Sequence, residues 1–245
     1  MTISIDLAEQ AVLISGGSSG IGLGIAQRFH EAGAVVHVTG TRSSADKYEH
    51  AEALEALHYH QVDVRDDQAV QTLVSSLERL DALVCCAGAV AYSRKEFGME
   101  SFRKIVDINL SGVMSFCTAS HRLLKKSKAG SVVIIGSTSS FIATPGQPAY
   151  GSSKGALVTL TKSLAEAWAR EGIRVNGVAP GFVATKMTAR THEDKASYEA
   201  TLSRIPMRRW GDAQEVGDAA VFFASPMAAY ITGQMLLVDG GITLM

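Results

Sequence analysis

Short runs of branched apolar residues recur along the whole chain and alternate with longer segments of helical periodicity. This alternation is typical of βαβ units around a parallel sheet, because strands buried on both faces read as nearly continuous Val, Ile and Leu. We therefore expect an α/β fold with a doubly wound, mainly seven-stranded parallel sheet and helices on both faces. The predicted strands are Ala11–Ser15, Val35–Thr39, His58–Val62, Leu83–Cys86, Ser131–Ile135, Ile173–Val178 and Met235–Val238.

The other segments complete this layout. Residues His58–Val62 alternate polar with apolar side chains, which indicates a strand near the sheet edge. One apolar stripe runs from Phe102 to Leu124, and a second helix is expected over Ala149–Arg170, stopped by Gly172. No linker or repeat divides the chain, so we expect one domain over residues 1–245. The stretch 184–210 is the least regular, polar and charged, and suits a mobile cover over a substrate site.

Composition excludes several classes of function. The 245 residues carry 23 Lys and Arg against 24 Asp and Glu, a net charge of -1, which gives no broad field for nucleic acid or anionic membrane. No leader is visible in Met1–Gln10 and no segment is long and apolar enough to span a membrane. Cys85, Cys86 and Cys117 lack disulfide or metal spacing, so packing and a cytoplasmic location are expected. His58 and His60 share a strand face but lack a nearby third ligand, so no metal is expected.

A glycine-rich turn follows the first strand. Gly16, Gly20 and Gly22 stand in a G-x-x-x-G-x-G pattern, and helical spacing begins at Ile21. Glycines let a backbone approach a pyrophosphate, and the N–H groups at a helix start favour negative charge. The spacing differs from the usual dinucleotide fingerprint G-x-G-x-x-G, and tight packing alone is the competing interpretation.

The end of the second predicted strand bears on the choice of nucleotide. An acidic side chain at this place binds the ribose 2'-OH of NAD and repels the 2'-phosphate of NADP. This chain has no acid there, and Thr41 and Arg42 follow Gly40 instead. NADP is therefore preferred over NAD, against the alternative that Arg42 is a solvated loop cation.

Four polar residues further along could carry proton chemistry. Ser137 follows an apolar strand, and Tyr150 and Lys154 would share one face of a helix. An ammonium beside a phenol stabilises the phenolate and brings its pKa toward the working range, while Ser137 would hold the same substrate oxygen. Asn109 lies in an apolar stripe, so its amide is expected to be buried and hydrogen-bonded. Each residue separately also fits turn or packing chemistry; their combination and order favour catalysis.

Together these residues resemble the short-chain dehydrogenase/reductase family in its compact form, from about Ala11 to Gly241. The resemblance implies a Rossmann fold, a catalytic tetrad of Asn109, Ser137, Tyr150 and Lys154, and a homotetramer with the last strand in a subunit interface. Asp63 and Val64 look like the pair that contacts adenine. The cofactor-binding residues it implies are Gly16, Ser18, Ser19, Gly20, Ile21, Gly22, Thr41, Arg42, Asp63, Val64, Ala87, Gly88, Tyr150, Lys154, Pro180, Gly181, Val183 and Thr185.

Two departures from the family pattern stand out. The chain has Cys85-Cys86-Ala87-Gly88 where the family often has Asn-Asn-Ala-Gly, and so loses amides that brace the central sheet. Ser19 occupies a position where many NADP-preferring relatives carry a basic residue, which argues against NADP.

The expected function is an NAD(P)-dependent oxidoreductase that interconverts a small ketone and a secondary alcohol or polyol by hydride transfer, with Tyr150 as general acid and base. One alternative is reduction of a 3-oxoacyl group on an acyl carrier protein, suggested by the basic run Arg122, Lys125, Lys126 and Lys128, which a helix C-terminus also explains. Another is an NADP-sensing regulator without catalysis, against which the intact Ser137, Tyr150 and Lys154 argue.

Overall fold

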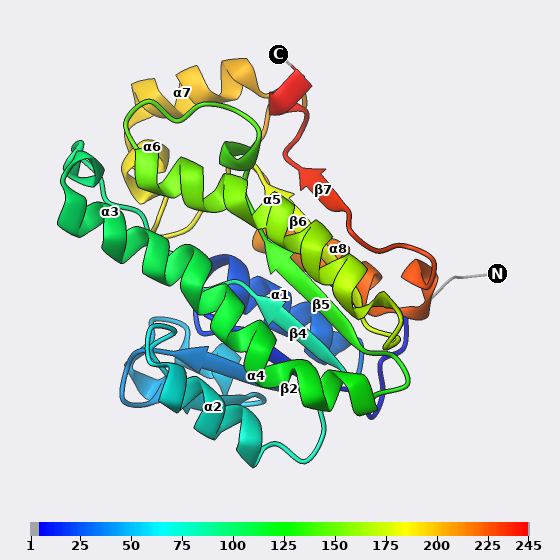
Figure 1. Cartoon of the computed structure of the whole chain (residues 1–245). Coiled ribbons are helices and arrows are strands. Elements are labelled where there is room, and N and C mark those ends of the chain that lie inside the picture. Colours follow the sequence, from blue (N-terminus) through cyan, green and yellow to red (C-terminus); the bar gives the residue numbers. More distant parts are fainter. Residues whose placement is uncertain (1–4, 245) are drawn as a thin grey trace.

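A single sheet of seven parallel strands runs through the molecule in the order β3-β2-β1-β4-β5-β6-β7 (Figure 1). The structure, a computed structural model, describes residues 5–244. The prediction that Met1–Gln10 carries no leader falls partly on residues 1–4, which lie outside the described residues. The strands are β1 (Ala11–Ser15), β2 (Val35–Gly40), β3 (His58–Gln61), β4 (Ala82–Cys85), β5 (Ser131–Ile135), β6 (Arg174–Pro180) and β7 (Met235–Val238).

All seven predicted strands are present, with ends within one residue of the predicted ones except that β6 continues two residues further, to Pro180. β3 is an edge strand, as its polar alternation indicated, and it pairs only with β2. The central strands β1, β4 and β5 are buried along their whole length because helices cover both faces. The doubly wound α/β fold class is confirmed.

The helices divide between the two faces of the sheet. On one face α1 (Gly20–Glu31) and α8 (Ala213–Ala224) pack around Ile25, Phe29 and Val216. On the other, α2 (Asp67–Ser76), α4 (Gly112–Lys126) and α5 (Pro148–Ala169) enclose a core that includes Phe116 and Leu157. Figure 1 shows α2, α4 and α5 in front of the sheet and α1 behind it. Short 3₁₀ turns lie at Ala45–Lys47, Ala51–Leu54, Lys95–Phe97, Thr138–Ser140, Pro226–Ala228 and Ile242–Leu244.

The predicted apolar stripe from Phe102 to Leu124 belongs to one long helical stretch with an interruption. α3 (Met99–Val106) leads through a π-helical turn, Asp107–Ser111, into α4. Such a turn widens the helix by one residue and often marks a functional position. It carries the buried Asn109.

Helix α5 lies within one residue of its predicted limits. Pro148 is in its first turn, where a fixed φ and a missing N–H carry no penalty. After the last turn Gly172 adopts φ +78° and donates its N–H to the carbonyl of Ala169. The predicted stop at Gly172 is therefore confirmed, and the reason is the left-handed backbone that glycine adopts without strain.

The segment 184–210 is more regular than predicted. It contains α6 (Ala189–Glu193) and α7 (Lys195–Arg204), which Figure 1 shows at the end of the molecule toward which the strand arrows point. Asp194 caps α7 by accepting a hydrogen bond from the Ser197 N–H. Four side chains of the segment 184–210 form a small separate core with Phe182 and Ile242, which lie outside it. The four are Tyr198, Leu202, Ile205 and Trp210.

Two expectations about reactive side chains can be compared with the structure. Cys85 and Cys86 pack on opposite faces of the sheet, as predicted, and all three cysteines are free. β2 brings a third imidazole, His37, into stacking contact with the rings of His58 and His60, which the sequence did not predict. Its Nδ1 lies 3.0 Å from Nε2 of His60. Within residues 5–244 no group of His, Cys, Asp or Glu is arranged to hold a metal ion.

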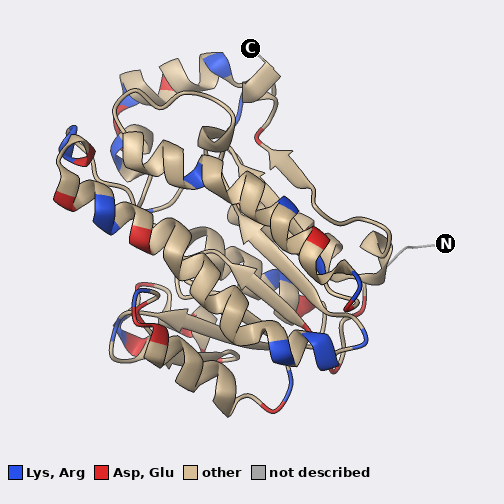
Figure 2. Ribbon diagram, in the orientation of Figure 1, with Lys and Arg blue, Asp and Glu red and all other residues tan. Residues whose placement is uncertain are grey.

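The charge pattern agrees with the near-zero net charge. In Figure 2 Lys and Arg are interspersed with Asp and Glu over the visible ribbon, without a large face of one sign. No helix in the described part of the chain is both long and apolar enough to cross a membrane.

Candidate active site

A cleft of about 810 Å³ opens at the carboxyl ends of the strands, where open α/β sheets bind ligands. The glycine turn after β1, the end of β2, and the segments after β3, β4, β5 and β6 all contribute to it. All eighteen residues that the family resemblance implied as cofactor contacts line this one cleft. Ser137 lines it too, whereas Asn109 lies beneath it.

The glycine turn is shaped by close approaches that no other residue allows. Gly16 has φ +70°, and a Cβ there would lie 2.7 Å from the Cα of Ala87. A Cβ on Gly22 would lie 2.1 Å from the carbonyl oxygen of Gly16. Ser19 caps α1 without a side-chain hydrogen bond, and the N–H groups of a first helical turn have no intrahelical acceptor. The turn thus offers donors and a helix dipole to an anion, which fits a pyrophosphate.

The end of β2 carries a feature that sequence reasoning missed. Tyr48, from the loop that follows, places its ring 4.8 Å from the Arg42 guanidinium carbon, and its hydroxyl accepts a hydrogen bond from the Arg42 N–H. A Cβ on Gly40 would lie 2.1 Å from that hydroxyl and 2.4 Å from Ser18 Oγ. An acidic side chain at position 40 would therefore collide with Tyr48. No sequence pattern pointed to Tyr48, because it lies in an irregular polar loop.

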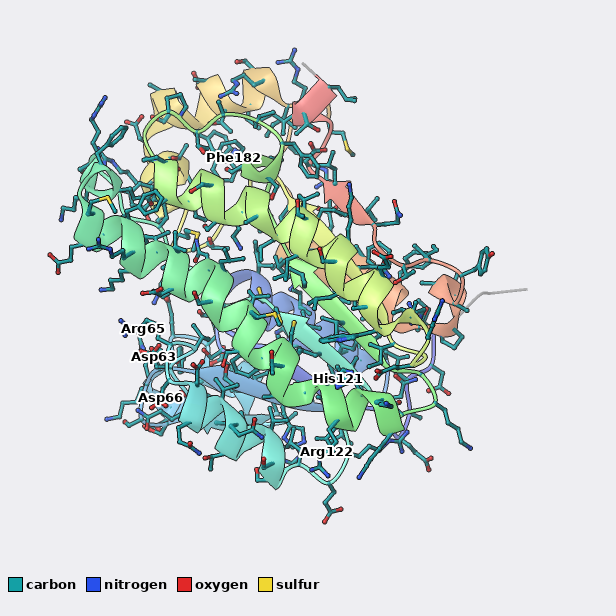
Figure 3. The ribbon with its side chains drawn as sticks, viewed as in Figure 1. Asp63, Arg65, Asp66, His121, Arg122 and Phe182 are labelled. Atoms are coloured by element: carbon teal, nitrogen blue, oxygen red, sulfur yellow. The ribbon has the colours of Figure 1, made fainter. Side chains whose placement is uncertain are left out.

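Two ion pairs lie among the residues that line the cleft. Arg65 pairs with Asp63 and holds the pKa of that carboxyl below its usual value; both are labelled in Figure 3. Lys186 pairs with Glu49 at 2.6 Å, which connects the segment after β6 to the loop after β2. Both partners of that pair are exposed, so its contribution to stability is small.

Tyr150 and Lys154 lie on the same face of α5, as their spacing predicted. The Lys154 ammonium is 5.9 Å from the Tyr150 ring centroid and donates a 2.8 Å hydrogen bond to the Ile135 carbonyl of β5. Burial lowers the pKa of Lys154 to about 8, so most of its charge remains at neutral pH. Burial also raises the pKa of Tyr150, which hydrogen bonding with Ser137 partly opposes. The expected lowering of the phenol pKa by Lys154 is thus not found in the protein chain alone.

Ser137 lies directly after β5 and caps the 3₁₀ turn Thr138–Ser140. Its Oγ accepts a 3.1 Å hydrogen bond from the Ser139 N–H, and Ser140 Oγ in turn bonds the Ser137 N–H and the Lys154 carbonyl. An accepting Oγ keeps its own hydrogen free to donate. The hydroxyl is therefore oriented by the backbone and remains available to a substrate oxygen or to Tyr150.

Asn109 connects three elements under the cleft floor. It is fully buried, and its Oδ1 accepts a 2.8 Å hydrogen bond from the Ala89 N–H. Its Nδ2 donates to the Ala89 carbonyl and to Ser153 Oγ. The predicted burial and pairing of this amide are confirmed. Gly88 stands between the two polar groups, since a Cβ there would lie 3.5 Å from Asn109 Oδ1 and 3.6 Å from Lys154 Nζ.

Glu96 is a second buried polar residue that sequence reasoning missed. Its side chain is fully enclosed; Oε2 accepts a 2.8 Å hydrogen bond from the Tyr150 N–H and Oε1 accepts one of equal length from the Ala91 N–H. Glu96 therefore accepts from the Tyr150 N–H, which has no intrahelical acceptor in the first turn of α5, where the helix dipole favours a carboxylate. Glu96 holds the loop after β4 against the turn that carries Tyr150. Its place in a charged run of the sequence gave no sign of burial.

The Cys85-Cys86 substitution is accommodated without the family's amides. Ser15 of β1 accepts the Cys86 N–H on its carbonyl at 3.1 Å, and its Oγ accepts the Ala87 N–H at 3.3 Å. Burial raises the pKa of Cys86 to about 11, and hydrogen bonding with Cys117 together with burial raises the pKa of Cys85 well above its usual value, so both remain thiols. The strand end is held by Ser15 instead.

The comparisons with known proteins agree with this site. The family model described as "Enoyl-(Acyl carrier protein) reductase" matches residues 16–243. The chain is 34% identical to glucose 1-dehydrogenase of Gluconobacter oxydans, covering 97% of this chain and 93% of that protein. It is 33% identical to the 3-oxoacyl-[acyl-carrier-protein] reductase of Rickettsia bellii, covering 98% and 99%.

A solved structure is equally similar. Gluconate 5-dehydrogenase from Burkholderia cenocepacia, in complex with NADP and tartrate, superposes with a TM-score of 0.89 at 30% identity and covers 98% of both chains. The chain belongs to the short-chain dehydrogenase/reductase family. It is accordingly an NAD(P)-dependent oxidoreductase that acts on CH–OH groups and the corresponding ketones.

Proposed function

We propose that the protein uses NADP(H) to interconvert a small ketone and a secondary alcohol or polyol, with Asn109, Ser137, Tyr150 and Lys154 as its catalytic set. The observation that carries this proposal is the meeting of Tyr150, Lys154 and Ser137 in the same cleft as the glycine turn. The curated relatives named for glucose and the structural neighbour named for gluconate support a hydroxylated substrate.

The cleft fits a dinucleotide by its own geometry. The close approaches at Gly16 and Gly22 pack the turn tightly against the start of α1, and the residues of that first helical turn, whose N–H groups have no intrahelical acceptor, line the cleft. When bound there, the nicotinamide supplies or accepts the hydride, and its oxidised form adds positive charge. That charge stabilises the Tyr150 phenolate, which burial disfavours in the protein alone.

The proton moves through Tyr150. In reduction its hydroxyl gives a proton to the substrate oxygen as negative charge develops, and in oxidation its phenolate form accepts a proton from the alcohol. Ser137 donates a hydrogen bond to the same oxygen. The hydrogen bond from Lys154 to the Ile135 carbonyl holds its ammonium beside the Tyr150 ring, and Asn109 holds the loop at Ala89 against α5 beneath them.

The test of this function is ketone-dependent oxidation of NADPH, read at the cofactor absorbance across a panel of ketones, ketoses and sugar acids. Turnover with members of the panel is the expected result. Tight NADPH binding with no turnover on any member contradicts the proposal and favours the nucleotide-sensing regulator. Faster turnover of a carrier-bound 3-oxoacyl group than of all free ketones favours the acyl-carrier alternative, which the Rickettsia relative supports.

We also propose that the protein prefers NADP over NAD because of Arg42. This arginine lines the cleft, and its guanidinium lies against the Tyr48 ring. It has no ion-pair partner among residues 5–244. Arg42→Ala is expected to raise the KM for NADPH roughly tenfold, because a charge-assisted contact to the 2'-phosphate is lost. The KM for NADH should change less than about twofold, and Arg42→Lys should retain part of the preference. Equal changes with both cofactors, measured by steady-state kinetics, contradict this role.

A homotetramer and a cytoplasmic location complete the proposal. The exposed apolar side chains Leu236 and Leu237 of the edge strand β7 support an interface at that strand. Light scattering tests the assembly: a tetramer of 25.9 kDa chains is expected, and a monomer at micromolar concentration contradicts it.

A further inference from the structure

A second cavity of about 520 Å³ lies beside the cofactor cleft and shares no lining residue with it. The loop after β4, the segment between β5 and α5, and the cover segment 184–210 enclose it. Three arginines line it, and we call it the arginine cavity: Arg94, Arg190 and Arg204. In Figure 3 the labelled Phe182, another lining residue, lies among these segments at the α6 and α7 end of the molecule.

The three guanidinium groups come from three separate elements. Arg94 precedes the 3₁₀ turn Lys95–Phe97, Arg190 belongs to α6, and Arg204 ends α7. Among residues 5–244 no Asp or Glu lines the cavity, and no ion pair includes any of the three arginines. By contrast, Arg28, Arg65 and Arg209 on other surfaces each have a carboxylate partner. The positive charge of the cavity is therefore uncompensated.

The contacts that these arginines do make leave most of their donors free. Arg190 donates one 3.4 Å hydrogen bond to Ser93 Oγ, and the guanidinium of Arg94 lies 4.7 Å from the ring centroid of Phe97. A guanidinium has five N–H donors in a planar fork that matches a carboxylate or a phosphate. The Ser93 contact and the Phe97 ring orient two of the groups without neutralising them.

The cavity adjoins the reactive end of the cofactor cleft. Tyr92 lines it, and its hydroxyl donates to the carbonyl of Met187, a residue of the cofactor cleft. Thr138 and Ser139 line it directly after Ser137, and Gln147 lines it at the N-cap of α5, three residues before Tyr150. A substrate whose carbonyl meets Tyr150 and Ser137 can thus extend its far end toward the arginines.

We propose that the arginine cavity binds an anionic group at the far end of the substrate, so that the substrate is a hydroxylated keto acid rather than a neutral ketose or polyol. The proposal rests on the proposed oxidoreductase function and names its substrate class. A carboxylate and a phosphate share the required chemistry. A carboxylate on a short polyol chain fits better, because Tyr92 and Gln147 line the same cavity as the arginines and have polar groups that can bind hydroxyls.

The test compares two ketones of the same carbon number that differ in the acid group, 5-ketogluconate and fructose, as substrates for NADPH oxidation. The wild-type kcat/KM is expected to be at least roughly tenfold higher for the acid, because a charge-assisted contact is worth about one such factor. Arg94→Ala/Arg190→Ala should lower kcat/KM for the acid by roughly 10–100-fold and for fructose by less than about twofold. Raising the ionic strength should weaken the preference.

The matched control is Arg122→Ala, an arginine of α4 that Figure 3 shows far from Phe182. This variant should leave kcat/KM for the acid and for fructose unchanged. Arg122 also belongs to the basic run that suggested an acyl-carrier substrate. The single variant Arg190→Lys should retain part of the preference, which guards against a general loss of folding. A second pair of substrates tests for a phosphate: acetoacetyl-coenzyme A and its phosphate-free analogue, the N-acetylcysteamine thioester. If the arginine variant lowers kcat/KM only for acetoacetyl-coenzyme A and not for 5-ketogluconate, the bound anion is a phosphate.

The outcomes separate this proposal from the function on which it rests. Equal wild-type turnover of acid and neutral ketone, or an equal loss for both in the arginine variant, overturns the keto acid assignment while the oxidoreductase stands. A lack of NADPH oxidation with every ketone overturns the function itself. An acid preference that the arginine variant abolishes supports the proposal.

Discussion

The floor of the active site and the segment that covers it use polar residues in opposite ways. On the floor, Asn109, Lys154 and Glu96 are at most 4% exposed, and each makes at least one hydrogen bond to backbone. In the segment 184–210, Arg190 and Arg204 are exposed, and the only side-chain hydrogen bond that either makes to the described residues is the 3.4 Å bond from Arg190 to Ser93 Oγ. Buried polar groups with satisfied partners are rigid and costly to change, whereas exposed ones are free to vary.

This difference assigns separate tasks to the two regions. In the proposed mechanism the floor fixes where a proton is given or taken, because its groups are held by β5, by α5 and by the π-helical turn. In the same proposal the segment 184–210 selects the substrate, since its charges are not paired with internal partners. Changes on the floor should therefore lower kcat for every substrate, and changes in the cover should discriminate between substrates.

A large effect is expected from Lys154→Met, which removes the buried charge beside Tyr150 at nearly constant volume. We expect kcat for any ketone to fall by roughly 10²-fold, the lower part of the range for acid and base catalysis, with folding retained because Lys154 bonds a single carbonyl. Steady-state kinetics with a charged and a neutral ketone measure it. A loss confined to one substrate would break the division between floor and cover.

A smaller effect is expected from Glu96→Gln. The amide keeps one acceptor oxygen for the Tyr150 or the Ala91 N–H but turns its NH₂ toward the other donor. We expect about 1–3 kcal/mol less stability and a fall in kcat of roughly tenfold, with the KM for NADPH unchanged because Glu96 does not line the cofactor cleft.

Thermal unfolding and steady-state kinetics measure both effects. Glu100→Gln, an exposed carboxylate of α3, is the matched control and should change neither. A destabilised Glu96→Gln variant with normal kcat would show that the buried carboxylate supports the fold but does not position Tyr150.

The smallest effect concerns the sheet edge, which is remote from the tyrosine. Burial, together with the neighbouring His58 and His60, lowers the pKa of His37 to about 4. The unfolded chain, with its ordinary imidazole pKa of 6.5, then binds more protons than the folded chain between pH 6.5 and 4. Stability is therefore full above pH 6.5 and is lost as the pH falls toward 4.

His37→Phe should keep the stacking and reduce this loss by about 1 kcal/mol, or roughly 2–4 °C in Tm between pH 7.5 and 5. Calorimetry at the two pH values measures it, and His30→Phe, at an exposed position near the end of α1, serves as control. A variant that loses as much stability in acid as the wild type contradicts the assignment. Activity at pH 7.5 should be unaffected.

Much of the floor could be predicted from sequence because its signals are local. Continuous apolar runs give the buried strands, the glycines after β1 mark the turn, and the four-residue spacing of Tyr150 and Lys154 gives their shared helix face. An expected strand end also places Ser137 at the cleft. Each of these inferences uses residues within one element or at its boundary.

The remaining features depend on contacts between distant segments. Glu96 is buried only because the loop after β4 meets α5, and His37 joins His58 and His60 only through the pairing of β2 with β3. The helices α6 and α7 are short and polar, so they lack an apolar stripe that periodicity could detect. The π-helical turn at Asn109 extends an ordinary helical pattern by one residue and leaves no separate signal.

The most direct test of the central claim is the turnover of Tyr150→Phe with NADPH and its best ketone, with cofactor affinity measured by NADPH fluorescence. The substitution removes one hydroxyl and keeps the ring that lines the cleft. Proton transfer through that hydroxyl predicts a fall in kcat of roughly 10²–10⁴-fold with NADPH affinity nearly unchanged. A Tyr150→Phe enzyme that turns over at the wild-type rate would contradict it.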